Sequence, residues 1–277
     1  MFRGNYNFFD YKYNIVGYTG QDFGSIAQKL YLIISIVLLI SLLIILRKLS
    51  KEKVLTIIRI VSIFLVLFYI AKTTWESIYD IRLTGSFNYG LLPMDTCSIV
   101  MYAGLISGFC KGKIKEYSDA WLSTACILGG FANMLFLNAL KYYPFLSFGA
   151  TYSMVWHFLM VFLGLLLIVT NYVPKKYTTI LKGFLFHLII SIIVIPIDFI
   201  KDWDFMLYKN LGGVPIFEDI ATKLSLNNLG FLNPLIMVLL YFISFNIIFL
   251  IPMGIRKILG VKNVKKNICG ENIKSNK

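Results

Sequence analysis

The sequence predicts an all-α membrane protein, a polytopic bundle of about seven transmembrane helices. The first observation is composition: 58% of the 277 residues are hydrophobic, 15% are charged, and the mean hydropathy is +0.74. Soluble domains contain about 45–50% apolar and about 25% charged residues, so a soluble enzyme and a disordered chain are both excluded. The second observation is a series of long apolar stretches, and the third is the distribution of Lys and Arg between them.

Each of the apolar stretches is long enough to cross a bilayer, because about 17–25 helical residues span a hydrocarbon core of about 30 Å. The first, over 27–46, begins late and lacks a small-residue cleavage site, so an anchor is expected and not a removed signal peptide. The others follow at 54–79, 91–109, 121–139, 150–170, 179–200 and 232–251. This division predicts an extracytoplasmic segment over 1–26, a transmembrane domain over 27–251 and a basic cytoplasmic tail over 252–277.

The positive-inside rule sets the orientation of these helices. Residues 47–59, 110–120, 171–182 and 252–277 hold 18 Lys and Arg, whereas residues 1–29, 82–90, 140–149 and 201–231 hold 8. The N-terminus is therefore predicted outside and the C-terminus in the cytoplasm. This rule also accounts for the net charge of +13, so no nucleic-acid partner is expected. The basic tail is either a topology determinant alone, which we favour, or also a contact for anionic lipid headgroups.

Ionisable residues inside the predicted helices indicate a candidate site, because they are costly in a bilayer and usually face the bundle interior. The second helix carries Lys72, Glu76 and Asp80 on one face near its outer end, where the spacing lets Lys72 and Glu76 pair. The other polar residues of the outer half are Asp95 and Cys97 in the first two turns of the third helix, His157 in the first two turns of the fifth, and Asp198 at the end of the sixth.

Cys97 and His157 are predicted at the same depth, roughly 8–10 Å below the outer ends of their helices. A thiol and an imidazole are the pair needed for nucleophilic catalysis, in which the imidazole removes the thiol proton and the thiolate attacks an acyl carbonyl. Asp198 is the carboxylate expected to orient the imidazole. The alternative is structural, with Cys97 as a small apolar filler and His157 as a hydrogen bond between helices.

Structural roles are favoured for the remaining polar and small residues. The four cysteines have no CxxC spacing and the two histidines form no HExxH pattern, so neither a disulfide framework nor a metal site is expected. A hydrogen bond between helices is the favoured role of His187, Asn133 and Asn138, and contact with substrate is the alternative for the two asparagines. Gly129-Gly130 is expected to allow close packing of helices or a turn.

The segment Leu92 to Ser98 reads Leu-Pro-Met-Asp-Thr-Cys-Ser. With the order of the helices, it resembles the YwaF-type bacterial integral membrane proteins, which are related to eukaryotic TMEM-class phospholipid acyltransferases. That family opens one helix with Leu-Pro-Leu-His-Leu-Cys, carries a His before an apolar run in a later helix, and closes the sixth with Pro-x-Asn and then Asn-Tyr. The matching places are Cys97, Trp156-His157-Phe158, Pro196-Ile197-Asp198 and Trp203-Asp204-Phe205, and the likeness covers roughly residues 54–251.

The resemblance implies that Cys97 is the nucleophile and His157 its base. The chain departs from the family pattern at Asp95, where the family has His, and at Asp198 and Asp204, where Asn is usual. If the family's His is essential, these departures imply an altered or inactive member. They also add negative charge near the thiol, which disfavours the thiolate unless a nearby cation compensates.

The resulting hypothesis is a lipid acyltransferase of the bacterial plasma membrane, in which an acyl chain passes between phospholipids through a thioester on Cys97. No cofactor is expected, because the acyl donor is itself a lipid. Contacts with the phospholipid are expected from Asp95, Lys72, Glu76, Trp156, Trp203 and Asp204. The alternatives are a small transporter or permease, with a polar pathway through Lys72, Glu76, Asp80 and Asp198, and a noncatalytic assembly or sensor protein. The sequence leaves the oligomeric state open.

Overall fold

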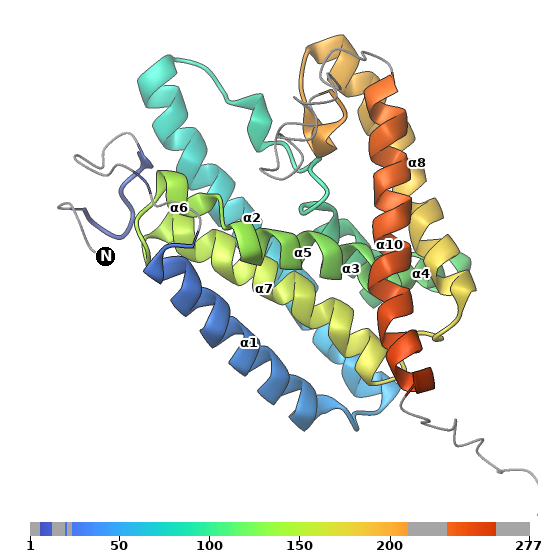
Figure 1. Ribbon diagram of the computed structural model, residues 1–277. Helices are drawn as coiled ribbons and strands as arrows, with labels where there is room; N and C mark the ends of the chain where they lie inside the picture. The colour runs from blue at the N-terminus through green and yellow to red at the C-terminus, as the bar shows by residue number, and fades with distance from the viewer. Residues whose placement is uncertain (1–5, 13–19, 21–23, 210–231, 259–277) are drawn as a thin grey trace, which may run out of the picture.

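The computed structural model describes residues 6–12, 20, 24–209 and 232–258 and confirms the predicted all-helical membrane bundle (Figure 1). The α-helices are α1 (Ile26–Leu46), α2 (Lys51–Thr84), α3 (Ile99–Phe109), α4 (Gly112–Leu122), α5 (Ala125–Phe136), α6 (Ala139–Tyr142), α7 (Phe148–Val169), α8 (Tyr177–Lys201) and α10 (Leu232–Ile258). Two short 3-10 helices, η2 (Tyr89–Leu91) and η3 (Phe205–Leu207), follow α2 and α8. The described residues contain no strand.

Within the described residues, six helical stretches are long and apolar enough to cross a membrane, which makes the chain a multi-pass membrane protein. They are α1, α2, α7, α8, the Leu232–Leu250 part of α10, and α4 to α6 taken together over Gly112–Tyr142. The predicted helix over 91–109 is the exception, because its helical part, α3, has only 11 residues. At about 1.5 Å per residue, α3 is about half as long as the hydrocarbon core is thick.

The predicted third helix is broken over Leu92–Ser98, and Pro93 is the main cause. Proline has no backbone N–H to donate, and it disfavours a helical conformation of the residue before it. Turns form instead, in which the Met94 N–H donates to the Leu92 carbonyl and the Ser98 N–H to the Asp95 carbonyl, each at 2.8 Å. Asp95 and Cys97 therefore precede α3, so their predicted place in the first two helical turns is wrong. Non-helical backbone at membrane depth is tolerated only inside protein or beside a cavity, so this segment indicates where a site lies.

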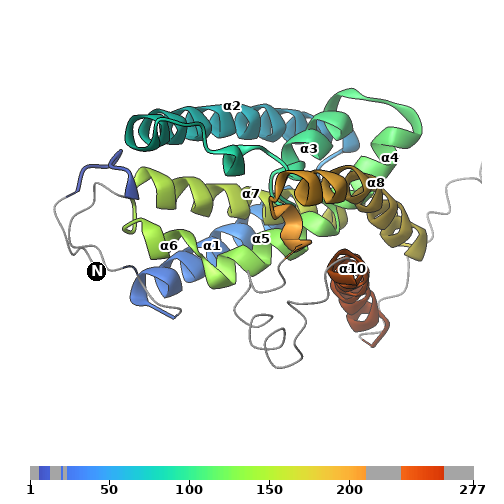
Figure 2. The ribbon, with the colours of Figure 1, turned by 90° about the horizontal axis from the view of Figure 1, so that it is seen from above.

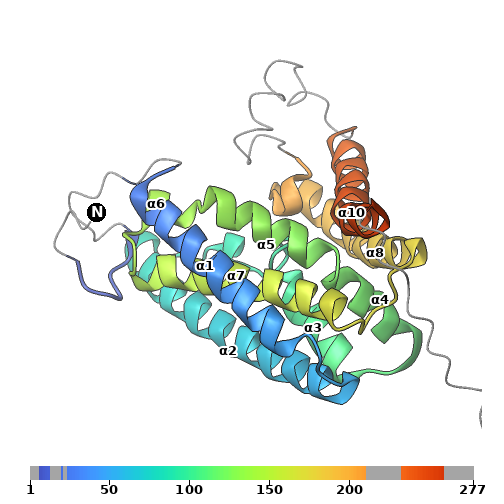
Figure 3. The same ribbon diagram turned by 60° about the horizontal axis from the view of Figure 1, so that its bottom comes forward.

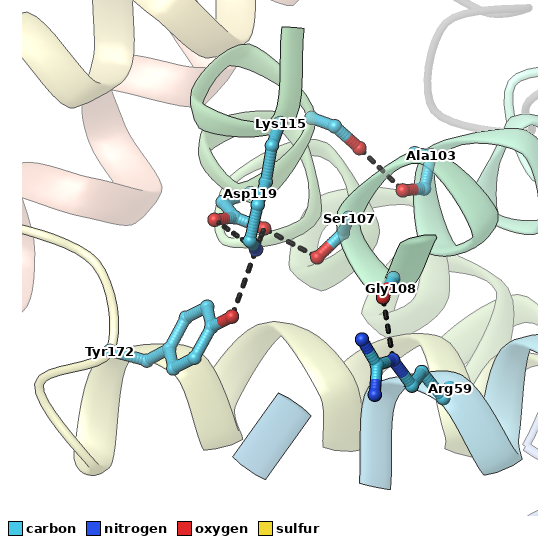
Figure 4. Close-up of polar contacts among 8 residues, drawn as sticks. Arg59, Ala103, Ser107, Gly108, Lys115, Asp119 and Tyr172 are labelled. Carbon is cyan, nitrogen blue, oxygen red and sulfur yellow. Dashed lines mark hydrogen bonds and ion pairs between the residues drawn. The ribbon is translucent and has the colours of Figure 1, made fainter. Parts of the chain in front are cut away.

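The predicted connection over 110–120 also differs, because most of it forms α4. Lys115 and Asp119, two of its charged residues, have partners within the protein. The Lys115 ammonium pairs with the Asp119 carboxylate at 2.9 Å and donates to the Tyr172 hydroxyl at 2.8 Å (Figure 4). Next to this pair, the Arg59 Nε donates to the Gly108 carbonyl at 2.7 Å. A helix whose polar side chains find such partners continues where a hydrophobicity pattern alone predicts a loop.

The contacts of Figure 4 gather the predicted cytoplasmic connections at one end of the bundle, because they join residues from 47–59, 110–120 and 171–182. The connections predicted outside meet at the opposite end. There the Tyr11 hydroxyl donates to Asp80 at 2.7 Å, and the Phe148 N–H donates to the Phe8 carbonyl at 2.8 Å. The helices therefore alternate in direction as the charge pattern requires, and the N-terminal segment packs against the outer ends of α2 and α7.

The central helix of the bundle is α7, which contacts α1, α2, α4, α5 and α6. Figure 2 shows α2 on one side of α7, and Figure 3 shows α1 crossing it on another. More than half of the α7 residues are buried, and His157 is one of them. On the other side of the molecule, α10 packs against α8 and α5. A side chain on α7 is therefore held in place from several directions.

Close approach of α5 to α7 depends on Gly130, so the packing role predicted for Gly129-Gly130 is confirmed for Gly130 alone. A Cβ atom on Gly130 would lie 2.7 Å from the Val161 Cγ2 and 2.9 Å from the backbone oxygen of His157. A Cβ atom on Gly129 would meet nothing nearer than 3.5 Å, which is ordinary van der Waals contact. Small residues at such crossings let membrane helices approach closely, which stabilises their association.

We expect Gly130→Ala to lower the stability of the folded protein by about 1–3 kcal/mol, because the added methyl group forces the α7 backbone away from α5. The matched control is Gly129→Ala, which should be neutral or slightly stabilising, by up to about 1 kcal/mol, because alanine favours helix. Thermal unfolding of both variants in detergent measures the difference. Equal melting temperatures for the two variants would contradict the packing described here.

Candidate functional site

A cavity of about 540 Å³ lies in the outer half of the bundle, against the non-helical segment before α3. This volume is in the range of about 300–1,000 Å³ that is usual for small-molecule sites. Its wall is formed by α2, the segment Gly90–Ser98, α5, α7, η3 and α10. The polar and aromatic residues of the wall are Tyr69, Lys72, Asp95, Thr96, Cys97, Ser98, Asn133, Asn138, Tyr152, Trp156, His157, Tyr241, Ser244 and Phe245.

Side chains from three helices hold the non-helical segment in position. The Tyr69 hydroxyl of α2 donates to the Leu91 carbonyl, and the Trp156 indole of α7 donates to the Cys97 carbonyl at 3.1 Å. The Thr96 and Tyr241 hydroxyls are 2.7 Å apart, which ties the segment to α10. These bonds satisfy polar groups that would otherwise be costly at membrane depth, and they fix where the Cys97 thiol lies.

The Cys97 thiol is half-buried, free of a disulfide and directed towards α5. A Cβ atom on Gly129 would lie 3.8 Å from the sulfur, and Asn133, one turn further along α5, lines the same cavity as the thiol. Cys97 and His157 line the same cavity, so the structure brings the two predicted residues together. In the described part of the chain, no hydrogen bond joins the thiol directly to the imidazole.

His157 is 8% exposed, and its ring is oriented by its own helix. The Nδ1 atom is 2.7 Å from the Ser153 carbonyl oxygen, which only accepts, so Nδ1 carries the proton. The Nε2 atom then holds a lone pair, as a base requires. The predicted orientation of His157 by Asp198 is therefore wrong, because the Ser153 carbonyl takes that place.

Asp198 is fully buried and has a different partner. Its Oδ1 accepts a hydrogen bond from the Phe205 N–H at 3.0 Å, which holds the turn after α8 and thereby η3. Asp198 does not line the cavity, whereas Met206 and Leu207 of η3 do. The carboxylate thus supports the cavity wall indirectly, through the position of η3. A direct chemical role for Asp198 stays a prediction.

Of the residues expected to contact substrate, Lys72, Asp95 and Trp156 line the cavity. The predicted pairing of Lys72 with Glu76 is confirmed. Glu76 itself is buried behind Lys72, where it also accepts a hydrogen bond from the Tyr143 hydroxyl at 3.4 Å. The Lys72 ammonium lies 5.5 Å from the centre of the Tyr152 ring, so a positive charge is held at an aromatic part of the wall.

Trp203 and Asp204 were expected to contact substrate, but neither residue lines the cavity. The Trp203 ring stacks on Tyr89 with the centroids 5.4 Å apart. The Asp204 Oδ1 accepts a hydrogen bond from the Lys209 N–H at 2.8 Å. Both residues therefore belong to the outer connection after α8.

The sequence analysis did not single out Tyr69 or Tyr241, which form part of the cavity wall. Asn133 and Asn138 also line the cavity, although a helix-bridging role was favoured for both asparagines. For His187 the structural prediction is confirmed, because the Trp121 indole donates to its Nδ1 at 3.4 Å. Among the described residues, no group of three or more His, Cys, Asp or Glu side chains is placed to hold a metal ion.

No family model, curated protein or solved structure matches this chain in the comparisons with known proteins. The basic tail lies mostly outside the described residues, as does the predicted outer connection over 210–231. The site is therefore interpreted from its own geometry.

Proposed function

We propose that the chain is a membrane acyltransferase that moves an acyl chain between phospholipids, as an altered member of the YwaF-type family in the bacterial plasma membrane. The observation that carries the proposal is that Cys97 and His157 border one cavity with an otherwise mostly apolar and aromatic wall. Such a wall suits the acyl chain and ester of a lipid, whereas the thiol and imidazole supply a nucleophile and a base.

The reaction needs two acyl transfers. His157 Nε2 takes the Cys97 proton, the sulfur bonds to the ester carbonyl carbon, and the carbon–oxygen bond to the glycerol breaks as the imidazolium returns the proton to the leaving oxygen. A hydroxyl or amine of an acceptor lipid then attacks the thioester and gives its proton to His157, which restores the free thiol. Catalytic hydrogen bonds are often formed only once substrate is bound, so the present separation of the thiol and the imidazole is compatible with this sequence.

The charges around the thiol bear on whether the thiolate forms. Asp95 lines the cavity and disfavours a second negative charge beside it. Lys72 lines the same cavity and interacts with Asp95, so its ammonium offsets that carboxylate. The imidazolium produced by proton transfer from Cys97 provides the second compensating charge.

A second candidate function is transport, and the broken helix before α3 favours it. Substrate sites of transporters are often built from interrupted helices near the bilayer midplane. A transporter needs a route from this cavity to the inner end, where the contacts of α3 with α2 and with α4 in Figure 4 hold the helices together. In this candidate Cys97 has no chemical role, which separates the two functions experimentally.

The test uses purified protein in vesicles that contain a phospholipid with an isotope-labelled acyl chain and an unlabelled lysophospholipid acceptor. The expected result is labelled diacyl product from wild-type protein and none above background from Cys97→Ala. Movement of intact phospholipid between leaflets, measured in parallel, tests transport. Unchanged acyl chains together with leaflet movement that does not need Cys97 would overturn the acyltransferase proposal in favour of transport.

A further inference from the structure

The face of α5 that is turned towards the Cys97 thiol carries two small residues and an amide. Ala125, Gly129 and Asn133 follow one another at intervals of one helical turn, and all three line the cavity. Gly129 has no side chain, so the space that a Cβ atom would fill, 3.8 Å from the sulfur, belongs to the cavity. Asn133 places a carboxamide in the wall of the same cavity, one turn further along α5. A group bonded to the sulfur on this side therefore lies next to the helical turn that carries Asn133.

Asn133 does not hold helices together, which is the usual role of asparagine in a membrane. Two other asparagines of the described chain are tied down: Asn246 Nδ2 donates to the Phe242 carbonyl at 2.8 Å, and Asn88 Nδ2 donates to Asp80 at 3.1 Å. The Asn133 carboxamide has no such oxygen partner among the described residues. A polar amide is costly in an apolar bundle without a partner, so its position at the cavity indicates a ligand.

The N-terminus of α3 adds positive electrostatic potential near the Cys97 thiol. This helix of 11 residues begins two residues after Cys97, and the side chain of its N-cap residue, Ser98, makes no capping hydrogen bond. The positive end of the helix dipole therefore faces the segment that carries the thiol.

We propose that Asn133 is a catalytic residue whose Nδ2–H group stabilises the oxyanion of the tetrahedral intermediate on Cys97. This inference rests on the proposed acyltransferase function. When the sulfur bonds to the ester carbonyl carbon, the carbon–oxygen π electrons move to the oxygen, which becomes negative beside the sulfur. The Asn133 amide, in the same cavity wall as the thiol, donates a hydrogen bond to that oxygen. The hydrogen bond is released when the carbon–oxygen double bond re-forms and the glycerol oxygen leaves.

The test compares two reactions of the Cys97 thiol in the full-length protein. A p-nitrophenyl fatty-acid ester acylates the thiol through an oxyanion, whereas iodoacetamide alkylates it by displacement at carbon without one. Both are followed by mass spectrometry of the peptide that contains Cys97. We expect Asn133→Ala to slow acylation by about 10²–10³-fold, as loss of one oxyanion donor does elsewhere, with little change in the alkylation rate.

Asn246→Ala is the matched control, because it removes an asparagine side chain of α10 that does not line the cavity. It should leave both rates unchanged. Acylation at the wild-type rate in Asn133→Ala would overturn the inference, and so would an equal fall of both rates, which would indicate a general effect on the thiol. Wild-type protein that is alkylated but never acylated at Cys97 would instead overturn the proposed function itself.

Discussion

Replacement of Cys97 by alanine is expected to abolish acyl transfer, a loss on the order of 10⁴–10⁶-fold, because the thiol is the group that carries the acyl chain in the proposed reaction. The thiol borders the cavity, and the Trp156 indole holds its backbone in place through the carbonyl. The measurement is the initial rate of labelled acyl transfer in vesicles, divided by the amount of folded protein.

Cys110→Ala is the control for this prediction, because Cys110 is exposed at the end of α3 and lies far along that helix from the cavity-lining segment. Its activity should equal that of wild type. Transfer that persists in Cys97→Ala would show that the sulfur is not the nucleophile.

Replacement of His157 by glutamine should lower the rate of acyl transfer by about 10²–10⁴-fold, because the general base is lost while a polar side chain remains. The Nδ1 of His157 is already bound to the Ser153 carbonyl, so the change removes the free Nε2 as proton acceptor. We would measure the acylation rate of Cys97 by the p-nitrophenyl ester as a function of pH. Thiolate formed at high pH should partly restore the rate in the variant.

The corresponding control is His187→Gln, which changes the other buried histidine. His187 bonds to Trp121 and contacts the Tyr241 ring, with centroids 4.2 Å apart, so a loss of stability is expected. The acylation rate per folded molecule should nevertheless stay close to that of wild type. A similar fall in both histidine variants would indicate that His157 acts through packing alone.

The long helices could be predicted because apolar length and Lys and Arg placement report directly on membrane insertion. The same signals missed the break over Leu92–Ser98, since this segment is apolar enough for a helix but Pro93 and the turn bonds after it prevent one. They also missed α4, because the hydrophobicity pattern did not reveal that Lys115 and Asp119 pair with each other. Hydropathy measures burial, whereas these two outcomes depend on hydrogen bonding.

Only the depth of the candidate site in the membrane could be predicted from the sequence. Counting residues from the helix ends placed Cys97 and His157 at one level, and both line the same cavity. Counting does not say which way a side chain faces, so Asp198 was expected beside His157 although it bonds to the Phe205 N–H. The place of Asn133 next to the thiol depends on how closely α5 approaches the non-helical segment, and Gly129 was the only sign of that in the sequence.

The most direct test of the account is the intact mass of the protein after incubation with phospholipid. A covalent acyl intermediate on Cys97 predicts a mass increase of one acyl chain in wild type, its removal by neutral hydroxylamine, which cleaves thioesters, and no increase in Cys97→Ala. A folded wild-type protein that acquires no acyl mass from any of several phospholipid classes would contradict the central claim.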